Sequence, residues 1–220
     1  AIEYYNSKDE MFDLADKWKE SKSNISKFRE QEFSFIFQST NLFELVPILD
    51  NVIISSFAED IKVVTDDAEK LLKSFLPSKL DKYNIRLAGN LSGGQKQRLA
   101  FVRALVPRSR VLFCDEPTGN LDVGNARKVM NKLRDSLQKN KSTALIVSHD
   151  IHLAVEYASK IVLVTKKVRS NKSHYGSIEG NNQYVRCGDK KWKSDSAEFT
   201  KDEFIDFLIM HFINSVEDEK

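Results

Sequence analysis

Short apolar runs alternate with longer segments of helical periodicity through most of the chain. The apolar runs are predicted strands, and they span residues 33–37, 111–114, 143–147 and 161–164. Apolar residues at helical spacing lie between or beside them, at 48–57, 65–76, from near 92 to 106, 123–139 and 151–158. Strands that alternate with helices predict an α/β fold, with a parallel sheet covered by helices on both faces.

The start of the chain is less regular. Residues 2–5 fit a strand, and residues 9–20 fit a short helix of modest periodicity. Asn24 could cap a second short helix that runs through Arg29.

The end of the chain changes character after about residue 166, where basic and polar residues dominate. One or two hairpins are predicted at 174–177 and 184–188. Thr200-Lys201-Asp202-Glu203 is a capping box that opens a very apolar final helix, which packs on a sheet edge or, alternatively, binds a partner. We therefore expect a C-terminal extension at 169–220.

Composition narrows the class of protein. The 220 residues are 41% hydrophobic and 30% charged, as in soluble globular proteins, and no apolar run approaches membrane-spanning length. A net charge of +2 gives no electrostatic argument for binding nucleic acid. Cys114 lies in an apolar strand, so we expect a reduced core thiol in a cytosolic protein rather than a disulfide with Cys187.

A glycine-bearing turn, Leu91-Ser92-Gly93-Gly94-Gln95, runs directly into a predicted helix. Ser92 can be the N-cap of that helix, and this role alone would explain its hydroxyl. Glycines are costly in a first helical turn, so Gly93 and Gly94 favour a ligand that comes close to the backbone. Unpaired amides at a helix N-terminus carry partial positive charge, which suits a phosphate.

Polar side chains also lie at the ends of three predicted strands. Gln38, the pair Asp115-Glu116, and His149 each follow one of these strands. Ligands gather at the carboxyl ends of strands in a parallel sheet, so we expect one shared site. Two carboxylates there suit a magnesium ion and an attacking water. Taken alone, the glycine turn also fits an ordinary helix start, Gln38 a loop amide, and Asp115-Glu116 a solvated strand edge. Their occurrence together in this order favours a functional site.

These features together resemble the ATP-binding cassette (ABC) ATPases over roughly Phe33 to Val164. The sequences of residues 35–42 and 116–122 are similar to those of the branch that serves lipoprotein release and macrolide export. The matching motifs are the Q-loop glutamine Gln38, the signature motif Leu91 to Gln95, Walker B with its following glutamate at Val111 to Glu116, the D-loop at Gly119 to Asp122, and the switch histidine His149.

One motif of that family is absent from the sequence. None of the eight glycines begins the phosphate-binding pattern Gly-x-x-x-x-Gly-Lys-Ser/Thr, and the first residue is Ala1 rather than Met. In the family this loop lies a few tens of residues before the Q-loop, so we expect an N-terminal truncation rather than a natural pseudo-ATPase. A chain without the loop and its lysine should bind ATP weakly by itself.

The resemblance implies a P-loop NTPase-like parallel-sheet core with an inserted helical subdomain at about 39–95, all within an ABC ATPase domain at 1–168. ATP and Mg²⁺ are the implied cofactors. Asp115 and Gln38 would hold Mg²⁺, Glu116 would be the general base and His149 would stabilise the γ-phosphate. The residues that would bind a partner's nucleotide or couple the two sites are Leu91, Ser92, Gly93, Gly94, Gln95 and Asp122.

The resemblance further implies a head-to-tail dimer with a second ABC ATPase domain and a separate transmembrane permease. The chain would then be peripheral on the cytoplasmic face of the membrane, with no nucleic-acid partner. The alternatives are a non-transport ABC ATPase and a non-catalytic interaction module. On the helix after the signature turn, Arg98 and Arg103 are expected to be solvated or paired with nearby acids.

Overall fold

The computed structural model describes residues 3–5, 10–56, 61–77, 80, 82–168, 174–178, 182–188 and 191–217. These form two compact units, Ala1–Val147 and Ser148–Lys220. The domain boundary predicted after residue 168 rests on the change to basic and polar residues in the sequence. It differs from the boundary between the two compact units and stays a prediction.

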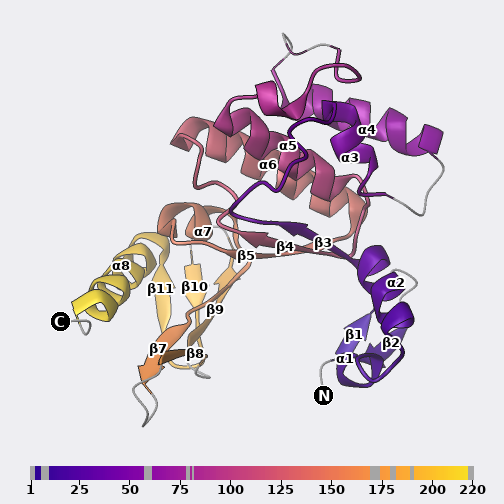
Figure 1. The fold of residues 1–220 in the computed structure, drawn as a ribbon. Helices are drawn as coiled ribbons and strands as arrows, with labels where there is room; N and C mark the ends of the chain where they lie inside the picture. Colours follow the sequence, from indigo (N-terminus) through magenta and orange to yellow (C-terminus); the bar gives the residue numbers. More distant parts are fainter. Residues whose placement is uncertain are drawn as a thin grey trace. The chain divides into compact units, whose positions relative to one another are not determined.

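A three-stranded parallel sheet forms the centre of the first unit (Figure 1). Its order is β3 (Phe33–Ile36), β4 (Val111–Asp115) and β5 (Thr143–Val147). Helices α5 (Gly93–Leu105) and α6 (Val123–Asn140) lie over one face of this sheet. Alternate strand residues such as Ile36, Leu112 and Cys114 are buried, as the two-residue period of a strand requires. The predicted α/β fold with a parallel core is confirmed.

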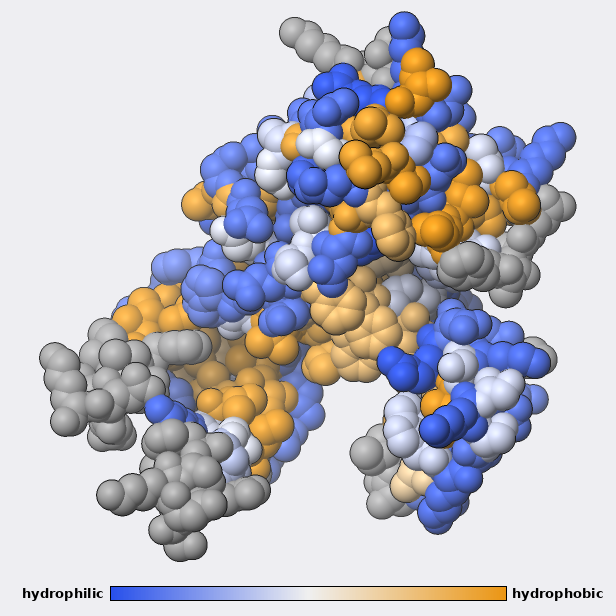
Figure 2. Space-filling view, viewed as in Figure 1, coloured by the Kyte–Doolittle hydropathy of each residue, from blue (hydrophilic) through white to orange (hydrophobic). Residues whose placement is uncertain are grey.

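The other face of this sheet carries exposed apolar side chains. Phe35 is 36% exposed, Phe37 47%, Leu145 59% and Val147 61%. The rings of Phe35 and Phe113 stack with their centroids 5.2 Å apart. Figure 2 shows this hydrophobic area beneath the helical layer. Among the described residues α5 and α6 share one face, and α2 (Lys22–Glu32) meets the other face at its β3 edge, where the rings of Phe28 and Phe33 lie 5.3 Å apart.

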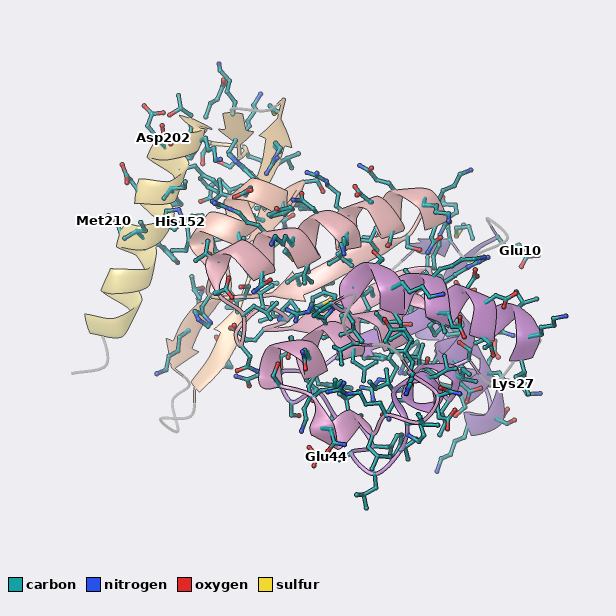
Figure 3. The ribbon with its side chains drawn as sticks, turned by 90° about the horizontal axis from the view of Figure 1, so that it is seen from above. Glu10, Lys27, Glu44, His152, Asp202 and Met210 are labelled. Carbon is teal, nitrogen blue, oxygen red and sulfur yellow. The ribbon has the colours of Figure 1, made fainter. Side chains whose placement is uncertain are left out.

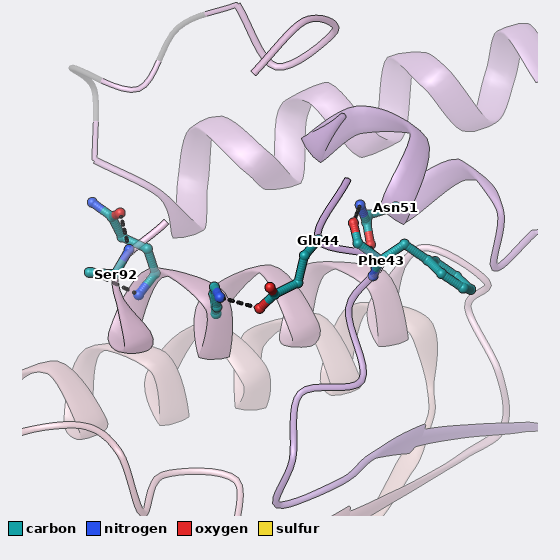
Figure 4. A network of polar contacts seen from close by, with 6 residues as sticks. Phe43, Glu44, Asn51 and Ser92 are labelled. Atoms are coloured by element: carbon teal, nitrogen blue, oxygen red, sulfur yellow. Dashed lines mark hydrogen bonds and ion pairs between the residues drawn. The ribbon is translucent and has the colours of Figure 1, made fainter. Parts of the chain in front are cut away.

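The helical block inserted between β3 and β4 contains α3 (Ile48–Ile53), α4 (Ile61–Phe75), a 3-10 turn at Ala88–Asn90 and then α5. Phe75 of α4 stacks on Phe101 of α5, with ring centroids 6.3 Å apart. The buried side chain of Asn51 holds the loop before α3 (Figure 4). Its Oδ1 accepts from the Phe43 amide at 2.8 Å, and its Nδ2 donates to the Phe43 carbonyl at 3.0 Å.

The N-terminal segment differs from the prediction. β1 (Glu3–Tyr5) pairs antiparallel with β2 (Met11–Asp13), and α1 (Leu14–Lys17) and α2 (Lys22–Glu32) follow. The helix predicted over 9–20 is wrong where its first part is described, because Met11 pairs with Tyr5 and the Asp13 carboxylate caps a helix that begins only at Leu14.

The cap of α2 also differs from the prediction. Ser21, not Asn24, precedes the first helical residue, and its Oγ accepts from the Asn24 amide at 3.4 Å. Ser21 can act as the cap because its hydroxyl accepts from the amide three residues later, whereas Asn24 already lies inside the helix.

The second unit is built around a four-stranded antiparallel sheet of order β11-β10-β9-β6. The strands are β6 (Lys160–Val162), β9 (Gln183–Cys187), β10 (Lys191–Lys193) and β11 (Glu198–Thr200). A separate hairpin joins β7 (Thr165–Val168) to β8 (His174–Ser177). The helices are α7 (Ile151–Tyr157) and α8 (Lys201–Glu217). The predicted hairpins are confirmed, whereas β6 pairs antiparallel with β9 instead of extending the parallel sheet.

An aromatic core joins α8 to this antiparallel sheet. Tyr184, Trp192 and Phe204 are almost fully buried, and Trp192 stacks on Phe204 with centroids 4.9 Å apart. The predicted capping box is present, because the Glu203 carboxylate accepts from the Thr200 amide at 2.8 Å. Figure 3 shows Met210 further along α8, where its side chain is 57% exposed.

Candidate active site

Two neighbouring strands bring three of the predicted site residues to one edge of the parallel sheet. Ile36 of β3 pairs with Cys114 of β4, so Gln38 follows β3 at the level where Asp115 and Glu116 end β4. Gln38 and Asp115 are exposed and Glu116 is half-buried. The Glu116 amide donates to the carbonyl of Val147, the last residue of β5, at 2.9 Å. The neighbouring strand ends agree with the expectation from the sequence, while a shared site and the roles of these side chains stay a prediction.

Glu116 has an unusual backbone conformation. Its φ is +47°, in the left-handed region that side chains other than glycine rarely adopt. The turn that follows is closed by the Gly119 amide donating to the Glu116 carbonyl at 3.2 Å and the Leu121 amide donating to Thr118 at 3.0 Å. A conformation of this kind costs on the order of 1–3 kcal/mol and is typical of functional sites.

A buried glutamine on α5 holds this turn in place. Gln97 is fully buried, and its Nε2 donates to the Pro117 carbonyl at 2.7 Å. Among the described residues its Oε1 has no hydrogen-bond partner. Sequence reasoning missed Gln97, although a polar side chain between buried positions of a helix is a signal that could have found it.

The glycine-bearing turn forms the N-terminus of α5 (Figure 4). Ser92 is the N-cap: its Oγ accepts from the Gln95 amide at 3.4 Å, and the Gln95 Oε1 accepts from the Ser92 amide at 2.9 Å. A Cβ added at Gly93 would meet no atom within 4 Å, whereas one at Gly94 would meet Leu121 at 3.3 Å. Packing within the chain therefore explains the absence of a side chain at Gly94 but not at Gly93.

Asp122 is the N-cap of α6. Its Oδ1 accepts from the Asn125 amide at 2.9 Å and its Oδ2 accepts from the Asn125 Nδ2 at 2.6 Å. These hydrogen bonds favour the ionised carboxylate and lower the pKa of Asp122. A helix cap accounts for this aspartate in the chain by itself.

The loop after Gln38 is fastened to α5 by two side chains. The Arg103 guanidinium donates to the carbonyls of Thr40 and Asn41 at 2.8 and 2.7 Å. Lys96 pairs with Glu44 at 2.5 Å. The expectation that Arg103 is solvated or paired with an acid is wrong, because its partners are loop carbonyls and burial lowers its pKa.

Comparison with known proteins decides the family. The ABC transporter family profile matches residues 4–119, more than half of the chain. The chain belongs to the ABC transporter family. The lipoprotein-releasing system ATP-binding protein LolD of Leptospira interrogans is 37% identical over 161 residues, covering 73% of this chain and 67% of LolD. The macrolide export ATP-binding/permease protein MacB of Rhodopirellula baltica is 36% identical over 159 residues, covering 68% of this chain and 22% of MacB.

Solved ABC cassettes have the same fold. The dimeric structure of MJ0796, a bacterial ABC transporter cassette, has a TM-score of 0.55 at 29% identity and covers 65% of this chain and 62% of that one. MJ0796 bound to ADP and Pi after hydrolysis has a TM-score of 0.54 at 26% identity, with 66% and 63% covered. The solved cassettes confirm the predicted fold class. The likeness to LolD and MacB confirms the predicted resemblance to the branch for lipoprotein release and macrolide export, and this chain spans 67% of LolD and 22% of MacB.

His149, the predicted switch histidine, belongs to the second unit. His149 lies two residues after the end of β5, and its side chain is exposed. Because the two units are described separately, its place at the edge that carries Glu116 stays a prediction.

The described residues contain no group of three or more His, Cys, Asp or Glu side chains placed to hold a metal ion. The predicted magnesium ligands, Gln38 and Asp115, are a smaller set than that, so their assignment stays a prediction. No helix within the described part of the chain is long and apolar enough to cross a membrane.

Proposed function

We propose that this chain is the ATP-binding and ATP-hydrolysing part of an ABC transporter. It lies on the cytoplasmic face of the membrane and drives transport through a separate transmembrane subunit. The observation that carries the proposal is the meeting of Gln38, Asp115 and Glu116 at one edge of the parallel sheet. The family membership and the names of LolD and MacB, both described as ATP-binding, support it.

The donor atoms at this edge fit Mg²⁺. Gln38 and Asp115 offer an amide oxygen and a carboxylate oxygen from neighbouring strand ends, and both side chains are exposed. Mg²⁺ prefers hard oxygen ligands and takes one or two from the protein, with water and phosphate oxygens supplying the rest. When bound, it would neutralise negative charge on the phosphates of ATP.

Glu116 is the residue best placed to act as general base. The turn that ends β4 fixes its backbone through hydrogen bonds to Val147 and Gly119. Gln97 fixes the next residue, Pro117, from the helix that carries the signature turn. A carboxylate held in this way can take a proton from a water that attacks a phosphate, while His149 would stabilise the charge that develops there.

The signature turn would close over the nucleotide of a second cassette. The position of a Gly93 side chain is open space, so another molecule can approach the backbone amides of the first turn of α5. The Ser92 hydroxyl and the Asp122 carboxylate cap their helices in the chain by itself. Both lie at helix starts where phosphate or a partner chain can reach them. The dimeric structures of MJ0796 support a second ABC domain as the partner.

The chain by itself is expected to bind ATP weakly. Its sequence holds no Gly-x-x-x-x-Gly-Lys-Ser/Thr pattern, whose amides and lysine cradle the phosphates of a nucleotide. Calorimetric titration of the 220-residue chain with Mg-ATP should therefore show no saturation at micromolar concentration. Fusion of a strand, a Gly-x-x-x-x-Gly-Lys-Ser/Thr loop and a helix ahead of residue 1 should bring the dissociation constant into the micromolar range. Micromolar affinity of the unfused chain would contradict this expectation.

A further inference from the structure

A small pocket lies where the end of α4 meets α5 and α6, and Gln38, Asp115 and Glu116 are not among the described residues that line it. Its volume is about 230 Å³. The residues that give it its chemical character are Ser74, Phe75, Arg98, Asn125, Lys128 and Lys132. No carboxylate is among the described residues that line it. The remaining lining residues, Leu76, Pro77 and Val129, are apolar, so the pocket is concave and positively charged with an apolar part.

The three cations of this pocket come from two helices. Lys128 and Lys132 are four residues apart on α6 and so lie on one face, and Arg98 reaches the pocket from α5. The Lys132 ammonium lies 5.3 Å from the centroid of the buried Phe75 ring. Within the described part of the chain, no ion pair to an acid involves any of the three.

Bringing three like charges together has a cost in free energy. Burial, followed by the charges of Arg98 and Lys128, lowers the pKa of Lys132. Like charges at this helical spacing destabilise a helix slightly, and a doubly charged anion between them would relieve the repulsion. Arg98 adds a planar guanidinium, which recognises phosphate with two parallel hydrogen bonds.

We propose that the pocket formed by Arg98, Lys128 and Lys132 binds the phosphate group of a small molecule, at a site separate from the candidate active site. A volume of about 230 Å³ is below the range of about 300–1,000 Å³ that is usual for drug-sized ligands. It therefore suits inorganic phosphate, pyrophosphate or the head of a small phosphomonoester. Asn125 and Ser74 supply neutral polar groups beside the three cations.

Two of the lining residues also touch the candidate active site. A Cβ at Gly94 of the signature turn would lie 3.8 Å from Nη1 of Arg98. Asn125 holds the carboxylate of Asp122 through its own side chain at 2.6 Å. Binding in the pocket should therefore change the environment of Gly94 and Asp122 without any nucleotide present. This change gives a readout independent of ATPase activity.

The test follows amide resonances of the ¹⁵N-labelled 220-residue chain during titration with inorganic phosphate, pyrophosphate or glycerol phosphate at constant ionic strength. We expect saturable shifts at Gly94, Asn125 and Lys132, and the compound with the lowest dissociation constant identifies the source of the phosphate group. Lys132→Gln and Arg98→Gln should each raise that constant at least about tenfold. Lys139→Gln, on the same helix but outside the pocket, should leave it within about twofold.

Three outcomes would overturn the proposal. Shifts that grow linearly without saturation for all three compounds, and equally with sodium chloride, would mean screening of surface charge only. An unchanged dissociation constant in both Lys132→Gln and Arg98→Gln would place the anion elsewhere on the chain. An equal loss in Lys139→Gln would show that net charge alone decides the affinity. Thermal melts of the variants, which alter partly exposed side chains, confirm that each remains folded.

Discussion

At the scale of single residues, the turn that carries Glu116 depends on the buried side chain of Gln97, whose Nε2 donates to the Pro117 carbonyl at 2.7 Å. Gln97 lies twenty residues before this proline in the sequence, on the helix that begins with the signature turn.

Gln97 should matter for stability more than an ordinary helix glutamine. Gln97→Ala removes the hydrogen bond to Pro117 and leaves a buried carbonyl and a cavity, so the free energy of unfolding should fall by about 1–3 kcal/mol. Gln138→Ala, at an exposed position of α6, should change it by less than about 0.5 kcal/mol. Urea denaturation measures both, and equal losses would show that Gln97 does not hold the turn.

The positions of the polar residues at strand and helix ends could be predicted from the sequence. Gln38 and Asp115 directly follow apolar runs, Glu116 comes next, and Ser92 precedes a helical pattern. Gln97 could not be predicted, because its partner, the Pro117 carbonyl, is twenty residues away in the sequence and local periodicity carries no information on such a partner.

The two cysteines should differ in reactivity. Burial raises the pKa of Cys114 to about 12, whereas Cys187 is exposed. A disulfide-exchange reagent at pH 8 should therefore modify Cys187 within minutes and Cys114 only after unfolding. Modification of both at the same rate in the native protein would contradict the burial of β4.

The same thiol predicts a pH dependence of stability. The folded pKa of Cys114 is raised above the value of 9.0 expected for an unfolded chain, so its contribution is complete below pH 9 and is lost between pH 9 and about 12. The urea midpoint should fall less over this range in Cys114→Ala than in the parent. An identical fall in both would exclude Cys114 as the group responsible.

At the scale of elements, the central strands and the helices beside them agree closely with the hydrophobic pattern. The N-terminal hairpin and the antiparallel pairing of β6 do not. Both depend on a choice of partner strand, Met11 with Tyr5 and Ile161 with Tyr184, and a single strand's sequence does not specify its partner. The helix caps at Ser92 and Thr200 were predicted correctly, since a cap and its amide are only three residues apart, whereas the cap predicted at Asn24 was wrong.

The loop after Gln38 should loosen when its anchor on α5 is removed. Arg103→Met deletes both hydrogen bonds to the carbonyls of Thr40 and Asn41, so hydrogen exchange in residues 38–47 should speed up by about tenfold or more. Arg29→Met, at an exposed position of α2, serves as the control and should leave this loop unchanged. Mass spectrometry of the peptides measures the rates, and equal exchange in the two variants would show that Arg103 does not restrain the loop.

At the scale of the whole molecule, the sheet face with Phe35, Phe37 and Leu145 is less covered among the described residues than the hydrophobic pattern predicts. Its side chains are apolar and exposed, and contiguous patches of this kind mark interaction surfaces in soluble proteins. Periodicity predicts which residues are apolar but not what covers them. The family profile and the likeness to LolD show the family, and the proposed chemistry is assigned to the edge where β3 and β4 end.

The most direct test is the role of Glu116 in the fusion that carries a Gly-x-x-x-x-Gly-Lys-Ser/Thr loop. Glu116→Gln keeps the shape of the side chain and removes the base, so steady-state phosphate release should fall at least about 100-fold. The dissociation constant for Mg-ATP should stay within about threefold, and the ATP-bound variant should form a stable dimer in size-exclusion chromatography. Glu30→Gln on α2 should hydrolyse ATP at the parent rate. Hydrolysis by Glu116→Gln at the parent rate would contradict the assignment of Glu116 as the catalytic base.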